Sequence, residues 1–273
     1  MITVGHDGEV FLRNKTTKLM VSSIGRIGGT KTDPMPIKHL PKGFCLQEDN
    51  VSVEFNIPPA TAAIEFATNI SMALVEIHRR AEEMGCEVAI DPSAHFPFAE
   101  LDNPQAQMAG CDPDLDAWTG KENLPPEIAG SDLRACGGHV HIGGVNDIPP
   151  FMLARACDVY LFTPFSALDK DKERRTLYGR PGAFRITPWG MEYRTLSNFW
   201  LRKPQYMEYV FNGVMAAVKD AQTWIGARGP TPDYFTSVHE QIMSIANPKT
   251  PENEVDYYRQ SIMSNYRIRP VFL

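Results

Sequence analysis

Four segments of the chain place polar residues at every second position, and this pattern constrains the fold more than any other feature. The segments read VGHDGEVF (4–11), NVSVEFNI (50–57), GHVHIG (138–143) and GMEYR (190–194). Residues i and i+2 of a β-strand point to the same face, so each segment predicts a strand with one polar and one apolar face.

The polar faces of these strands have an unusual composition, because they carry acids, histidines, asparagines and an arginine but no lysine. They comprise Asp7 and Glu9; Asn50, Ser52, Glu54 and Asn56; His139 and His141; Glu192 and Arg194. Carboxylates gathered in a sheet cavity repel one another and raise one another's pKa unless cations neutralise them. Carboxylate oxygens with an occasional imidazole suit Mg²⁺ or Mn²⁺, so the pattern favours a metal site.

A site with several such ions is what a nucleotide polyphosphate requires, because the ions bridge phosphate oxygens as the terminal phosphoryl group moves. Arg180, Arg185 and Arg194 are expected to hold phosphate or carboxylate oxygens in forked contacts. Each pattern also has a simpler interpretation when it is taken alone. Asp-x-Glu is usually a solvated strand edge, and Glu-x-Arg is commonly a surface salt bridge. The metal-site interpretation therefore requires the strands to be neighbours, which the sequence does not show.

The wider pattern predicts an α+β fold with a mostly antiparallel sheet, because strands return after helices without the regular spacing of βαβ units. The GxGxxG and GxxxxGK[ST] signatures are absent from the sequence. A long irregular connection at 92–131 is typical of a lid or substrate loop. Strands are predicted at 2–12, 44–57, 86–91, 133–144 and 190–196, and helices at 60–84, at 149–168 and from 203 to the end.

Composition narrows the class of protein. The 273 residues have a net charge of −6 and no cluster of Lys and Arg, which argues against a large nucleic-acid interface. The five cysteines are widely spaced without a CxxC pair, which indicates free thiols in a reducing compartment. The chain has neither a signal-peptide pattern nor an apolar run of membrane-spanning length. We therefore expect a protein without a membrane association, located in the cytoplasm of a cell or of a phage-infected host.

At this point the chain resembles the glutamine synthetase-like superfamily of carboxylate–amine ligases, and within it the small type 2 amidoligases found in phages. The matching motifs, in order, are GHDGEVF, GGTK, EDNVSVEFNIPP, GGHVHIGG, YGRPGAFR and GMEYRTLSNFW, which extend from residue 5 to about residue 200. GGHVHIGG together with EYRTLSNFW is a specific signal. The resemblance implies a glutamine synthetase-like catalytic domain, in which the sheet forms a curved active-site cavity and helices pack on its outer face.

The resemblance also implies roles for individual residues. The metal ligands it implies are Asp7, Glu9, Glu54, His139 and Glu192, with Asp49 and Asn50 near Glu54 at a spacing that departs from the classical one. Arg194 is expected to contact the reacting carboxylate or phosphate, and Arg180 and Arg185 resemble phosphate-facing arginines. His139, Lys31 and Arg185 are expected to contact the metal–nucleotide complex.

The reaction implied by the resemblance is the joining of a carboxylate to an amine, at the expense of ATP with Mg²⁺ or Mn²⁺, through an acyl phosphate. His141, Asp112 and Asp116 are candidates for the base that takes a proton from the amine. The acid and the amine stay open, and small molecules, peptides and a modified nucleobase are all compatible. A metal-dependent hydrolase using His139 and His141, and a non-catalytic binding or virion protein, are the alternatives.

The expected domain organisation follows from the extent of the motifs. Residues 1–200 are predicted to form the catalytic core, and residues 201–273 a helical segment packed on the same domain. The chain begins at the first catalytic strand, without the N-terminal domain by which glutamine synthetases complete a neighbour's active site. A homo-oligomer is compatible with the family, but the interface-built site and the large ring are in doubt.

Overall fold

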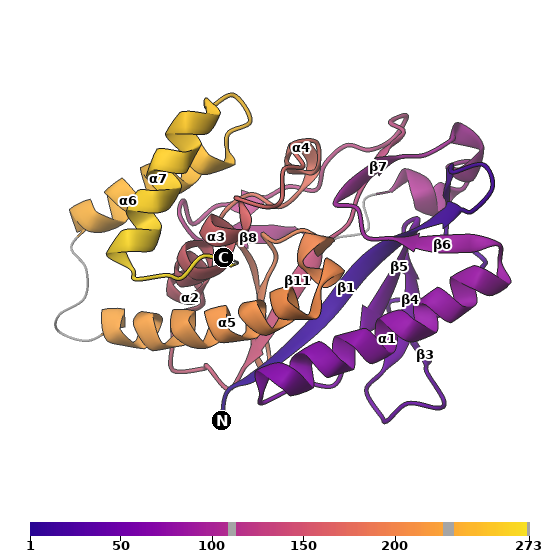
Figure 1. Ribbon diagram of the computed structural model, residues 1–273, viewed down its shortest axis with the longest axis horizontal. Coiled ribbons are helices and arrows are strands. Elements are labelled where there is room, and N and C mark those ends of the chain that lie inside the picture. The colour runs from indigo at the N-terminus through magenta and orange to yellow at the C-terminus, as the bar shows by residue number, and fades with distance from the viewer. Residues whose placement is uncertain (109–112, 226–231, 272–273) are drawn as a thin grey trace.

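The computed structural model describes residues 1–108, 113–225 and 232–271 (Figure 1). At its centre is a sheet of eleven strands whose pairings are all antiparallel among the described residues. The main path runs through β3 (Met35–Pro36), β4 (Cys45–Asp49), β5 (Ser52–Asn56), β1 (Thr3–Asn14), β11 (Gly138–Gly143), β13 (Gly190–Tyr193), β12 (Ala183–Thr187), β8 (Asp114–Asp116) and β9 (Glu122–Asn123). The far end of β1 also pairs with β2 (Met20–Val21) and β6 (Cys86–Ala89).

Most predicted strands are confirmed, but the segment at 44–57 is a hairpin rather than a single strand. β4 and β5 pair in register from Cys45 opposite Asn56 to Asp49 opposite Ser52. Asn50 lies in the turn with φ of 52°, a left-handed conformation that asparagine adopts more readily than most residues. Its amide donates to the carbonyls of Gln105 (3.1 Å), Ala106 (3.3 Å) and Met108 (2.7 Å), so Asn50 fixes the turn and does not join the polar face of β5.

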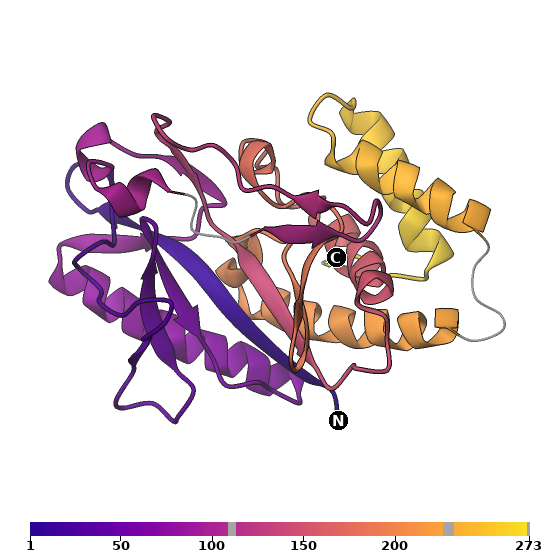
Figure 2. The ribbon, with the colours of Figure 1, turned by 180° about the vertical axis from the view of Figure 1, so that it is seen from behind.

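Two long helices cover one face of the sheet, as the opposite views in Figures 1 and 2 show. α1 (Ala63–Glu83) confirms the helix predicted at 60–84, and it ends before Gly85, whose φ of 68° closes the helix without strain. α5 (Pro204–Ile225) lies beside α1. The ring of Phe66 on α1 packs against Trp200 at 5.9 Å and Phe211 at 6.1 Å, which joins both helices to the apolar face.

A second group of helices lies at one end of the sheet. The helix predicted at 149–168 is interrupted: α2 (Pro150–Cys157) leads into a π-helical turn (Asp158–Phe162) and then α3 (Thr163–Phe165). α6 (Pro232–Ala246) and α7 (Glu252–Asn265) pack on that turn through a cluster that includes Val159, Phe162, Ile242 and Ile262. The division of the chain at residue 200 stays a prediction.

The connection at 92–131 is not a free loop, since β8 and β9 extend the sheet past β12. Its other elements are β7 (Ser93–His95), which pairs with β10 (Leu133–Ala135), and the 3₁₀ turns η1 (Phe98–Glu100) and η2 (Pro104–Gln107). The remaining short elements are α4 (Arg174–Leu177) and η4 (Asn198–Arg202).

The predicted fold class, α+β with a mostly antiparallel sheet, is confirmed. Within the described residues, none of the helices has the length and apolar character needed to cross a bilayer. Four of the five cysteines lie in the described part of the chain, and all four are free thiols: Cys45, Cys86, Cys136 and Cys157.

Candidate functional site

The four predicted polar faces lie on β5, β1, β11 and β13, which are direct neighbours in this order, and β12 follows β13 as a fifth strand. Because pairing is antiparallel and in register, opposed residues share a face and bring their side chains together. The opposed pairs are Glu54 with Glu9, Asn56 and His139 with Asp7, His141 with Glu192, and Glu192 with Arg185. We call the side chains on this side of the five strands the polar face.

One end of the polar face carries three carboxylates. Oxygens of Glu9, Asp49 and Glu54 all lie within 4.8 Å of one another. Burial, with the nearby charge of Asp49 added, raises the pKa of Glu9 to about 8. Burial also raises the pKa of Glu54 well above its usual range, and the charges of Asp7, Asp49 and Glu9 raise it further. Three acids held this close destabilise their own ionised forms, and a cation between them removes that penalty.

A second cluster, of Asp7, His141 and Glu192, lies on the middle strands with His139 beside it. Oδ1 of Asp7 is 3.1 Å from Nε2 of His141 and 3.5 Å from Nδ1 of His139, and that Nδ1 is 3.3 Å from Oε1 of Glu192. Burial would lower the pKa of His141, but Asp7 and Glu192 raise it overall. The two imidazoles outweigh the effect of burial on Asp7 and keep its pKa well below the usual range.

His139 differs from His141, although the two residues share a face of β11. Burial lowers the pKa of His139, and the neighbouring charge of Arg194 lowers it further. A neutral imidazole is the form that ligates metals, so His139 has the protonation state that a metal ligand needs.

Arg194 is the most enclosed cation of the polar face, with 5% of its surface exposed. One of its terminal nitrogens contacts Glu192, and the same nitrogen lies 3.4 Å from Nδ1 of His139. Its Nε donates to Oδ2 of Asp114 at 3.2 Å. Arg185 approaches Glu192 from the other side, at 3.4 Å between its Nη1 and Oε2. Arg185 lies on β12, a strand that the sequence analysis did not predict.

Arg180 and Lys31, the other two predicted cations, are exposed and lie at the periphery of the cluster. Arg180 lines a hollow together with Asp114 and Tyr178. Lys31 is close enough to Asp49 for its charge to lower the pKa of that acid, although burial outweighs it and the pKa is raised overall. Contact of either side chain with phosphate stays a prediction.

The acids proposed as bases from the 92–131 connection have different outcomes. Asp112 lies outside the described residues. Asp116 is held in a turn, where its Oδ1 accepts from the amides of Trp118 (2.7 Å) and Thr119 (3.2 Å), and its Oδ2 accepts from the Thr119 hydroxyl at 2.8 Å. These bonds occupy both oxygens of Asp116 in shaping the turn.

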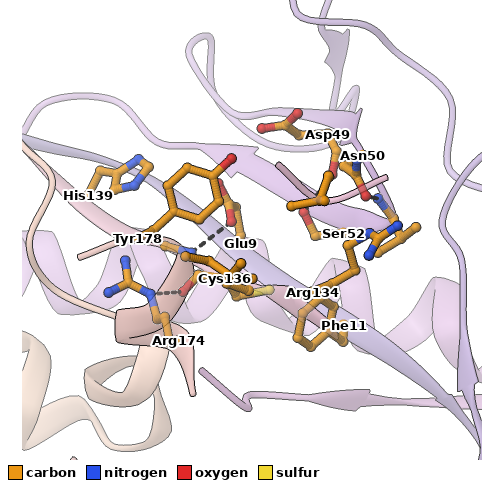
Figure 3. A pocket seen from close by; sticks show the side chains of 15 residues that line it. Glu9, Phe11, Asp49, Asn50, Ser52, Arg134, Cys136, His139, Arg174 and Tyr178 are labelled. Atoms are coloured by element: carbon orange, nitrogen blue, oxygen red, sulfur yellow. Dashed lines mark hydrogen bonds between the residues drawn. The ribbon is translucent and has the colours of Figure 1, made fainter. Parts of the chain in front are cut away.

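A pocket opens beside the three-carboxylate cluster (Figure 3). Its lining combines Glu9, Asp49 and His139 with apolar side chains and with two buried arginines, Arg134 and Arg174. The guanidinium of Arg174 donates to the carbonyls of Cys136 (2.8 Å), Thr195 (3.0 Å) and Leu196 (3.0 Å), so it braces the backbone around the pocket. Glu9 is oriented by the amide of Gly137, which donates to its Oε2 at 2.7 Å.

Three residues of the site were missed or left uncertain by sequence reasoning. Asp49 reaches the cluster only because the chain turns at Asn50, and Asp114 reaches Arg194 only because β8 joins the sheet. Arg174 lies in a segment without periodic pattern. The motif EDNVSVEFNIPP was the local signal that contained Asp49.

The two clusters fit divalent cations. Their donors are mostly carboxylate oxygens, the set that Mg²⁺ and Mn²⁺ prefer. Oδ1 of Asp7 is buried and makes no hydrogen bond with the described residues, and the ring nitrogens near it belong to imidazoles that can share a metal. The buried carboxyls of the first cluster have raised pKa values, which a bound cation would reverse.

Comparison with known families matches residues 129–226 to the family described as phage phiEco32-like COOH.NH2 ligase, type 2. The matched region contains β11, β12 and β13, which carry His139, His141, Arg185 and Glu192. The predicted resemblance to the type 2 carboxylate–amine ligases is thereby confirmed. A solved structure titled "GmaS/ADP complex-Conformation 1" is similar with a TM-score of 0.39 and 11% identity, over 97% of this chain and 70% of that chain. Comparison with curated proteins found no match.

Proposed function

We propose that the protein is an ATP- and Mg²⁺-dependent carboxylate–amine ligase that forms an amide through an acyl phosphate. The observation that carries the proposal is the pair of acid clusters on adjacent strands, with Arg194 and Arg185 on either side of Glu192. The family match over the strands that hold this arrangement supports it.

Two groups of residues would hold the cations: Glu9, Asp49 and Glu54 in one, and Asp7 and Glu192 of the second cluster, together with His139 beside them, in the other. Bound Mg²⁺ would neutralise charge on the polyphosphate and on the acids. Trp189, in the turn between β12 and β13, is 43% exposed and its ring lies 5.0 Å from that of His141. It offers a surface on which a nucleotide base can stack.

The reaction has two steps. An oxygen of the substrate carboxylate attacks the γ-phosphorus of ATP, the bond to the β-phosphate oxygen breaks, and ADP leaves. The nitrogen of the amine then attacks the carbonyl carbon, inorganic phosphate leaves, and the amine gives up a proton. Arg194 and Arg185 hold the transferring phosphoryl group and the acid, which positions them and stabilises developing negative charge.

His141 is the better placed of the two candidate proton acceptors in the described part of the chain, because it faces the cluster 3.1 Å from Asp7 while the oxygens of Asp116 are occupied in a turn. Its pKa is raised by Asp7 and Glu192 against the effect of burial, which strengthens it as a base.

The test is calorimetric binding of a non-hydrolysable ATP analogue with and without Mg²⁺. We expect binding to require Mg²⁺ and to weaken at least tenfold, about 1.4 kcal/mol, in Glu54→Gln and in Glu192→Gln. Glu122→Gln is the matched control, because this glutamate is exposed on β9 outside both clusters.

Absence of nucleotide binding under every metal condition would contradict the proposal. Retention of a divalent cation without nucleotide binding would then favour a metal-dependent hydrolase using His139 and His141. Binding of neither would favour a non-catalytic role.

A further inference from the structure

Asp158 is a fully buried acid outside the polar face. It begins the π-helical turn Asp158–Phe162, which interrupts the helix after α2. Such turns disturb the regular hydrogen bonding of a helix and are frequently found at functional sites. Burying a carboxyl group costs free energy unless its oxygens accept hydrogen bonds. The donors to Asp158 therefore identify the segments that it holds in place.

The partners of Asp158 come from two segments that are distant in sequence from it: the end of β13 with the residues after it, and the turn after β8. Its Oδ1 accepts from the hydroxyl of Tyr193 at 2.7 Å and lies 3.4 Å from the hydroxyl of Thr195. Its Oδ2 accepts from the indole Nε1 of Trp118 at 2.5 Å. These three donors are uncharged, so Asp158 acts through directed hydrogen bonds rather than through a salt bridge with them.

The residues held by Asp158 flank the Arg194 ion pair on both sides. Tyr193 and Thr195 are the two chain neighbours of Arg194. Trp118 follows β8, whose first residue, Asp114, accepts from Nε of Arg194. One carboxyl group therefore fixes the segment that carries the guanidinium and the segment that carries its acceptor.

β8 is short, and its join to β12 consists of two residue pairs, Ala183 with Asp116 and Phe184 with Leu115, and of a backbone hydrogen bond from the amide of Ala117 to the carbonyl of Gly182 at 2.9 Å. The contacts of Asp158 add side-chain hydrogen bonds to this short pairing. On its outer side the indole of Trp118 stacks on His239 of α6, with ring centroids 4.8 Å apart and planes 7° apart. The guanidinium of Arg155 lies 5.3 Å from the same indole. α6 and α2 thus both contact the residue that donates to Asp158.

We propose that Asp158 is a positioning residue for Arg194, and that Trp118 links it to α6. The hydrogen bonds to Tyr193 and Trp118 hold β13 and β8 at the separation that the Arg194–Asp114 contact requires. The catalytic meaning of this positioning rests on the proposed function, in which Arg194 contacts the reacting groups. The structural claim concerns Arg194 itself and is tested without any substrate.

The experiment measures solvent exchange of the Arg194 Nε–H proton by NMR of protein labelled with ¹⁵N arginine, the signal being assigned from its loss in Arg194→Lys. Wild type should show a protected proton, because this nitrogen is buried and donates to Asp114. Tyr193→Phe and Trp118→Phe each remove one donor to Asp158 and should speed the exchange at least tenfold. The backbone amide of Val53, a fully buried residue of β5 away from β13 and β8, reports global opening and should keep its wild-type rate.

Tyr160→Phe is the matched control, because Tyr160 lies on the same π-helical turn and its hydroxyl donates to Asp220 at 2.5 Å. It removes a tyrosine–aspartate hydrogen bond without touching β13 or β8, and the Arg194 exchange should stay at the wild-type rate.

An unprotected proton in wild type, or unchanged exchange in either Tyr193→Phe or Trp118→Phe, would overturn the positioning role and leave Asp158 as a core anchor alone. Faster exchange of the Arg194 proton in Tyr160→Phe, or faster exchange at Val53, would also overturn it, since the effect would then be a general loosening. If Tyr193→Phe does not fold, Trp118→Phe decides. Loss of the proposed function would appear separately, as absent nucleotide binding in wild type.

Discussion

The two faces of the central strands are built from alternate residues of the same chain segments, yet their chemistry is opposite. On β1, Asp7 and Glu9 enter the polar face, while His6 and Val10 are buried on the side of α1 and α5. The ring of His6 lies 4.6 Å from Trp200, and burial lowers its pKa to about 3, so it is neutral. Polar residues of β1 therefore differ in role according to the face they occupy: Asp7 and Glu9 belong to the candidate site, whereas His6 packs in the core.

The apolar face stabilises the fold, whereas the polar face costs stability. Burial of side chains such as Phe55 and Phe66 removes apolar surface from water, which is the main favourable contribution to folding. Burial of Glu9 and Glu54 opposes their ionisation, and their proximity adds to this effect. A bound cation, as we propose, would remove this cost by neutralising the acids.

The largest effect is expected on the apolar face. Phe55→Ala should lower the free energy of unfolding by about 3–5 kcal/mol, because it removes a fully buried ring and leaves a cavity. The measurement is urea unfolding at constant pH. Ile64→Ala on the exposed side of α1 is the control and should change little. Similar losses of unfolding free energy in both variants would contradict the conclusion that burial on the apolar face is what stabilises the fold.

A somewhat smaller effect is expected from metal on the polar face. Mg²⁺ at a hundred times its dissociation constant should raise the free energy of unfolding by about 2.7 kcal/mol. Asp49→Asn should lose most of this gain, because it removes one of three carboxylates within 4.8 Å of one another. The exposed Asp147→Asn serves as the comparison and should keep the full gain. If Mg²⁺ stabilises Asp49→Asn and Asp147→Asn equally, Asp49 is not a ligand of the proposed metal site.

The smallest effect, expressed as the change in the free energy of unfolding for each pH unit, is expected from Asp158 on the π-helical turn after α2. Burial raises its pKa from 3.8 to about 7, despite hydrogen bonds from Tyr193 and Trp118 that lower it. Between these values the folded state holds the proton that the unfolded state has released. The contribution of Asp158 to the free energy of unfolding is thus largest below pH 4. It falls as the pH rises toward 7, by at most about 1.4 kcal/mol per pH unit.

Asp158→Asn cannot ionise and should show a shallower fall in unfolding free energy between pH 5 and pH 7 than wild type. Urea unfolding at several pH values gives both slopes, and Asp147→Asn should follow wild type. Parallel curves for wild type and Asp158→Asn would show that this carboxyl group is ionised in the folded protein.

The local pattern was sufficient to predict β1, β5, β11 and β13 and the residues that share a face on each of them, but it did not predict β8, β9 or β12. Asp7 with Glu9, His139 with His141, and Glu192 with Arg194 follow from the two-residue period of a strand. The helix at 63–83 follows from apolar residues three and four apart and from Gly85 at its end. These features are short-range, and each depends on residues within one or two turns of the chain.

Tertiary structure decided which of these faces meet and which further residues join them. The hairpin at Asn50 brings Asp49 beside Glu9, and β8 brings Asp114 to Arg194 from a connection without periodic pattern. Asp158 reaches Tyr193 and Trp118 across 35 and 40 positions of sequence. The sequence by itself determined which side chains are present and which of them share a face of a strand, because the alternation of faces depends only on the local geometry of the backbone. Strand order and long-range contacts depend on the packing of the whole chain, which no local pattern encodes.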